Sequence, residues 1–193
     1  MWHYGQTLIS GDFSSDKTEA CVNSDIIITQ ESYGSPESWE WHFGTDADPA
    51  TANGIGPHTV QYSSGGNKTI VLTIDKGTDQ QIITKTAYVY VASVAPNDAS
   101  AISGNTEVVA GEKHTYSVTD QSDVYFNWEI PSKWTGSSST SEIEIEFTGA
   151  SGDGTITVTP TNGCGTGNPS SLDISASPST GISKIEQNRL NIY

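Results

Sequence analysis

The chain has the sequence SWEWHF at residues 38–43 and YFNWEI at residues 125–130. In both stretches large apolar side chains alternate with polar ones, which is the period-two pattern of a β-strand with one buried face. A second alternating run, opened by a glycine, follows each of them: GNKTIVLTI at residues 66–74 and GTITVT at residues 154–159. This repeated pair of patterns predicts two similar β-domains in tandem.

The spacing within the two halves is nearly the same. Trp41 precedes Ile70 by 29 positions, and Trp128 precedes Ile156 by 28. The repeat length of about 87 residues is too long for a solenoid and suits small sandwich domains. We therefore expect an all-β protein with two tandem antiparallel β-sandwiches.

Composition supports this fold class and limits the partners. The chain has 193 residues, enough for two domains of this size, and strand- and turn-forming residues are plentiful whereas sustained helical periodicity is absent. Its net charge of −15 argues against nucleic acid and anionic membrane surfaces as partners. The acidity fits either simple solubility or a calcium-rich or cationic environment.

The two cysteines, Cys21 and Cys164, fall one in each predicted domain. A disulfide needs Cα atoms within about 7 Å, which two separate sandwiches seldom offer, so we expect both thiols to be unbonded. No apolar run reaches membrane-spanning length, and we expect no membrane insertion. Met1 is the only methionine, which suggests a start residue attached to a monomeric fragment of a larger chain.

Three separated motifs in the first half resemble a polycystic-kidney-disease (PKD) domain: residues 34–44 (GSPESWEWHFG), 57–62 (PHTVQY) and 66–74. The resemblance implies a seven-stranded immunoglobulin-like sandwich over residues 11–94, after a lead-in at residues 1–10. Thr45-Asp46 stands where the family has Asp-Gly, so the usual tight turn is not expected.

The second half is similar to the divergent PKD-like type found in surface proteins of Bacteroidetes. The matching stretches are residues 125–136, 154–158 and 162–165, and they imply a PKD-like domain over residues 95–177. Members often carry a second cysteine just before an Ala-Gly pair, where this chain has Val109. The resemblance therefore leaves Cys164 without its usual partner inside the domain.

Residues 181–193 (GISKIEQNRLNIY) look like the opening of a type IX secretion C-terminal sorting domain. The resemblance places the start of a sorting segment at residues 178–193 and implies a parent protein that is secreted or displayed at the cell surface. A partial segment has no sheet of its own to join, so we expect it to be mobile in solution or ordered only by packing against a neighbouring molecule.

No motif indicates catalysis. The four histidines are scattered, and neither a His-Glu-x-x-His nor a Gly-x-Ser-x-Gly pattern occurs. We therefore predict that the chain is not an enzyme, and we assign no catalytic residue. Its most informative side chains are structural, because a large ring bridging two sheets is what a sandwich core requires; the predicted core residues are Trp41, Phe43, Trp128 and Ile130.

Two further groups are candidates for binding. Trp39 and Trp134 lie near strand or loop ends, where an aromatic ring either packs locally or stacks on a sugar. Asp46 and Asp48 share a loop with Asn53 and are either solvated turn carboxylates or calcium ligands. No other metal or cofactor is expected.

These observations leave two functions open. The first is a non-catalytic extracellular accessory module, acting as a spacer or a protein-interaction surface in a larger secreted or surface-anchored protein. The alternative is a module that binds carbohydrate or matrix protein and targets an attached enzyme. Its partners would accordingly be extracellular polysaccharide or protein.

Overall fold

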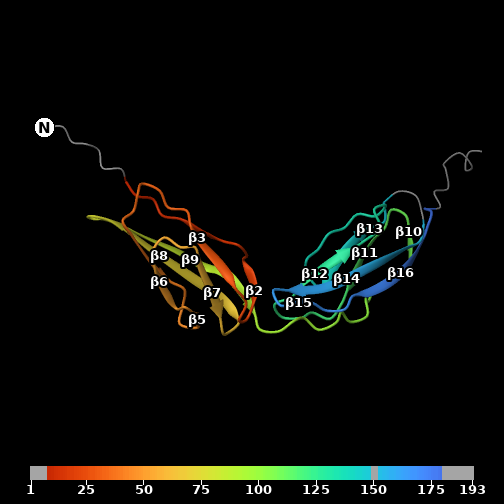
Figure 1. Cartoon of the computed structure of the whole chain (residues 1–193). Coiled ribbons are helices and arrows are strands. Elements are labelled where there is room, and N and C mark those ends of the chain that lie inside the picture. Colours follow the sequence, from red (N-terminus) through yellow and green to blue (C-terminus); the bar gives the residue numbers. More distant parts are fainter. Residues whose placement is uncertain (1–7, 149–151, 180–193) are drawn as a thin grey trace, which may run out of the picture. The chain divides into compact units, whose positions relative to one another are not determined.

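The computed structural model describes residues 8–148 and 152–179, which form two compact units (Figure 1). The first contains the described residues up to Pro96 together with Asn162–Gly165, and the second contains the rest. All regular structure in the described ranges is β-strand. The predicted all-β class with immunoglobulin-like sandwiches is confirmed.

The first unit is a sandwich of two sheets. One sheet has the order β1 (Phe13–Ser15), β3 (Ile26–Gln30), β7 (His58–Tyr62) and β5 (Ala47–Asp48). The other has the order β2 (Glu19–Cys21), β9 (Asp79–Ala92), β8 (Gly66–Lys76), β4 (Ser38–His42) and β6 (Thr51–Asn53). Neighbouring strands are antiparallel except for β2, which runs parallel to β9.

The core of this unit follows the predicted alternation. Trp41 and Phe43 are fully buried, and their rings stack with centroids 5.9 Å apart. The Trp41 ring also meets Phe13, from the opposite sheet, edge-on at 5.6 Å. A single indole thereby joins the two sheets, which is the arrangement that a thin sandwich core needs.

The second unit has a larger and a smaller sheet. The larger has the order β10 (Glu107–Val109), β16 (Ser170–Ser177), β14 (Gly154–Asn162) and β12 (Tyr125–Glu129), with the short β15 (Gly165–Thr166) also paired to β14. The smaller pairs β11 (Lys113–Ser117) with β13 (Glu142–Glu146). Here β10 is parallel to β16, while β14 is antiparallel to both β12 and β16.

The tryptophan at the centre of the second core is Trp134, which is only 5% exposed. Its ring meets Phe147 edge-on at 4.8 Å. Trp134 is buried because Thr135 pairs with Glu146 and places the preceding residue on the core. Gly154 leaves room for the ring, since a Cβ there would lie 2.9 Å from the Trp134 indole.

Trp128 and Ile130, the two predicted core residues of this unit, are half-buried and pack against the buried cluster. The Trp128 indole donates a hydrogen bond to the carbonyl of Thr140, at 2.9 Å. This ring therefore combines an apolar contact with a polar edge, and Trp134 supplies the deeper burial.

The cysteines are joined, so the prediction of two unbonded thiols is wrong. Cys21 and Cys164 form a disulfide with their Cα atoms 4.4 Å apart. The two residues meet because the turn Asn162–Gly165, which follows β14, belongs to the first compact unit. Gly163 permits this approach, since a Cβ at that position would collide with the backbone of Ala20.

The expectation of a mobile sorting segment concerns residues 178–193, most of which lie outside the described ranges. The lead-in predicted for residues 1–10 likewise falls largely outside them.

Candidate functional site

The loop that carries the calcium candidates is organised by an internal ion pair. Lys68, on β8, is 7% exposed, and its Nζ lies 2.5 Å from Oδ2 of Asp46. The same ammonium group donates to the Ser64 hydroxyl and the Gly65 carbonyl at 3.3 and 3.2 Å. It also lies 5.2 Å from the centre of the Tyr62 ring, so the cation is held by oxygens and an aromatic face together.

The charges in this cluster shift two pKa values in opposite directions. The hydrogen bond from Lys68, with a second from Ser64, holds the pKa of Asp46 below its usual value. Burial, reinforced by the nearby Asp46 carboxylate, raises the pKa of Tyr62 to about 12. At neutral pH the cluster is therefore an Asp–Lys ion pair beside an un-ionised phenol.

In this geometry the Lys68 ammonium group is the counter-ion of the Asp46 carboxylate. Asp48, the second calcium candidate, is exposed on β5. Among residues 8–148 and 152–179, no three His, Cys, Asp or Glu side chains come together in a way that could hold a metal ion. The loop as described is thus built for structure, with Asp46 pinning it to β8.

The two tryptophans considered as ligand contacts belong to different units. Trp39, on β4, is half-buried and packs against the core of the first unit, with its Nε1 buried and without an acceptor in the described part of the chain. Trp134 is buried in the second unit. A ring this deeply buried is not available to stack on a sugar.

The histidines in the described residues have separate local partners. The ring of His58 packs edge-on against Trp41, with centroids 5.4 Å apart, and its Nε2 lies 3.2 Å from the Gly54 carbonyl. His114 pairs with Glu112 at 2.9 Å. His58 therefore has a structural place beside the buried Trp41.

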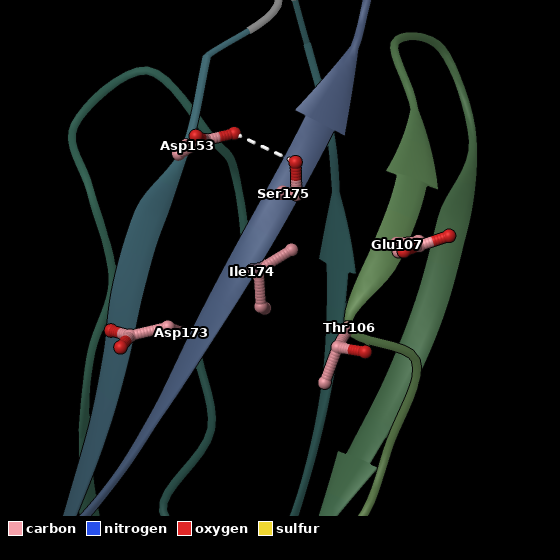
Figure 2. A pocket seen from close by; sticks show the side chains of 6 residues that line it. All are labelled: Thr106, Glu107, Asp153, Asp173, Ile174 and Ser175. Carbon is pink, nitrogen blue, oxygen red and sulfur yellow. Dashed lines mark hydrogen bonds between the residues drawn. The ribbon is translucent and has the colours of Figure 1, made fainter.

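A shallow pocket of about 290 Å³ lies on the second unit, and sequence reasoning missed it. Figure 2 shows its lining residues, which come from the start of β10, the approach to β14, and β16: Thr106, Glu107, Asp153, Asp173, Ile174 and Ser175. Alternation along β16 would have placed Asp173 and Ser175 on one face. The parallel pairing of β10 with β16, which brings in Glu107, has no local signal.

Hydrogen bonds hold two of the acidic groups of this pocket, Asp153 and Asp173. The Ser175 hydroxyl donates to Asp153 at 3.0 Å, and the Thr155 hydroxyl donates to Asp173 at 2.6 Å. The pocket therefore presents carboxylates and hydroxyls, groups that can accept hydrogen bonds from a hydroxyl-rich or cationic ligand.

The sequence of the second unit matches a known domain family. The match covers residues 95–174, and the family is described as a PKD-like domain. The match begins at residue 95, so residues 11–94, which make up most of the first unit, keep their resemblance to a PKD domain as a prediction.

The chain is similar to solved structures of other proteins. Fibronectin(III)-like modules of Clostridium thermocellum CbhA share 14% identity, with a TM-score of 0.51 over 89% of this chain and 97% of theirs. Murine CEACAM1b shares 10% identity, with a TM-score of 0.46 over 86% of this chain and all of that one. No curated protein matches the chain in sequence. At these identities the likeness concerns the fold alone.

No helix in the described ranges is long and apolar enough to cross a membrane.

Proposed function

We propose that this chain is a non-catalytic extracellular accessory module, serving as a spacer or protein-interaction segment of a larger secreted or surface-anchored protein. The observation that carries the proposal is that the side chains considered for binding have structural roles. Trp41 and Trp134 build the cores, and Asp46 pairs with the buried Lys68. The PKD-like match of residues 95–174 supports the same assignment.

The net negative charge argues against nucleic acid and anionic lipid as partners. The net charge of −15 would repel nucleic acid and anionic lipid, while it keeps an isolated spacer soluble and monomeric. The resemblance of residues 181–193 to a type IX sorting domain extends the proposal to export from a Bacteroidetes cell. Fractionation should then find the parent protein in the medium or at the cell surface, whereas recovery from the cytosol alone would contradict export.

The test of the spacer role is a binding panel with the purified chain. A glycan array and immobilised collagen should show no saturable binding, and assays with glycoside and peptide substrates should show no turnover. Saturable binding with a Kd below about 100 μM, which corresponds to about 5.5 kcal/mol, would favour the alternative of a targeting module.

That alternative has one specific feature in its favour, the acidic pocket of the second unit. Its carboxylates and hydroxyls could accept hydrogen bonds from sugar hydroxyls or from a basic matrix protein. If a ligand emerges from the panel, Asp173→Asn combined with Glu107→Gln should weaken its binding. Glu142→Gln, on β13 of the other sheet, is the matched control. Equal binding by both variants would place the ligand elsewhere.

A further inference from the structure

The disulfide closes a very large covalent loop. Cys21 ends β2, and Cys164 lies 143 positions later, in the turn after β14. Outside this loop lie β1 and β2 on the N-terminal side and β15 and β16 on the C-terminal side. Every other strand, and therefore most of the buried core of each unit, lies inside it.

From this connectivity we infer that the disulfide is a mechanical bypass that limits how far the chain can be stretched by its ends. Tension applied at the two ends passes along the backbone to Cys21, crosses the sulfur–sulfur bond and leaves through Cys164. The residues between the cysteines carry no end-to-end tension while the bond is intact. They cannot be drawn out even if their strands separate.

The length of chain that cannot be extended while the disulfide is intact is large. A fully extended chain spans about 3.3–3.6 Å per residue, so the closed loop retains on the order of 500 Å. Only the short segments outside the loop can lengthen under force. Pulling can peel β1 from β3 and β16 from β14, whereas β8, β9 and β14 remain within the closed ring.

The cysteine-bearing turn is held in place by contacts additional to the bond. The Asn162 side chain accepts a hydrogen bond from the Cys164 amide at 2.8 Å and donates one to the carbonyl of Val94 at 2.9 Å. On the opposite side, Cys21 is in register with Ala92 of the parallel strand β9. These contacts hold the turn that carries Cys164 close to the end of β9, the strand that pairs with Cys21.

The bypass is conditional on redox state. A dithiol reductant attacks one sulfur through its thiolate, forms a mixed disulfide and then closes on itself, so the reductant is oxidised and both protein cysteines become thiols. Oxidising surroundings outside the cell keep such a bond closed. The bypass follows from covalent connectivity alone, whereas its use as a tether rests on the proposed spacer function.

Single-molecule stretching tests the inference on the full chain, with one handle at each terminus. Under non-oxidising, reductant-free conditions the wild type should lengthen only through its two outer segments. With dithiothreitol present, the same molecules should release an additional length on the order of 500 Å. The Cys21→Ser/Cys164→Ser variant should release it without reductant.

Wild type measured with and without reductant is decisive even if the double variant fails to fold. Release of the full length by unreduced wild type would overturn the bypass, as would two titratable thiols in denatured, unreduced monomer. Either result would leave the spacer proposal standing. Saturable glycan binding, in contrast, would count against the spacer role and leave the bypass intact.

Discussion

Lys68 is an uncommon residue for a thin sandwich, because its ammonium group is withdrawn from water into a cluster of oxygens. Its partner Asp46 is less enclosed, with a side chain that is 29% exposed compared with 8% for Lys68. The two members of the pair therefore depend on each other unequally. Removing the carboxylate strands a buried charge, whereas removing the ammonium leaves a carboxylate that water can reach.

This asymmetry predicts the order of two variants. Asp46→Asn keeps the shape but leaves Lys68 without a counter-ion, and should lower the free energy of unfolding by about 3 kcal/mol. Lys68→Met keeps the apolar stem and should cost about 1 kcal/mol. Urea melts of both variants measure the difference, and a Lys68→Met variant that is the less stable of the two would contradict the assignment.

The same pair predicts a pH dependence. Because the Asp46 pKa is lowered in the folded state, the unfolded chain takes up the proton first, at about pH 3.9. The stabilisation is thus complete above that pH and is lost as pH falls through the folded-state value. The stability difference between wild type and Asp46→Asn should be constant from pH 7 to pH 5 and shrink below pH 4. A difference that stays unchanged from pH 7 down to pH 2 would contradict the lowered pKa of Asp46.

Calcium gives an independent check on the same loop. A site with a Kd of about 1 mM would add about 1.4 kcal/mol at about 10 mM calcium, and would raise the melting temperature by several degrees. Because Asp46 already pairs with Lys68, we expect calcium to produce no more shift than magnesium does. A rise that calcium alone produces would show that the loop opens to a metal ion.

At the scale of elements, strand alternation and the Trp-to-Gly-strand spacing were enough to predict both sandwiches. They also predicted the burial of Trp41 and Phe43. Alternation cannot describe Trp134, which lies in a loop after β12 and is buried through the pairing of Thr135 with Glu146, eleven positions later. The acidic pocket could not be predicted for the same reason, since the β10–β16 pairing joins residues far apart in sequence.

The two tryptophans of the second unit should therefore differ in importance. Trp134→Ala removes a buried ring together with its edge-on contact to Phe147, and should cost about 3–5 kcal/mol. Trp128→Ala removes a half-buried ring and one hydrogen bond, so we expect a smaller loss. Urea melts followed by circular dichroism compare the two, and equal losses would show that Trp128 is no less central than Trp134.

At the scale of the whole molecule, the disulfide could not be predicted because it depends on where a single turn lies. Treating each repeat as a closed unit placed Cys164 in the second sandwich. The structure instead assigns Asn162–Gly165 to the first unit. The side-chain-free Gly163 is compatible with that placement, but a glycine in a turn has too many other uses to indicate it.

The size of the closed loop predicts how reduction changes stability. Cross-linking residues 143 positions apart lowers the entropy of the unfolded chain. In the loop-closure model this raises the free energy of unfolding by about 5 kcal/mol at 25 °C. Reduction restores that entropy and should lower the thermal midpoint of the first unit, to which both cysteines belong. The Cys21→Ser/Cys164→Ser variant should melt like the reduced wild type and should not respond to dithiothreitol. Coincident melts of oxidised and reduced wild type, with thiol titration verifying each state, would show that the bond constrains an unfolded chain that is already compact.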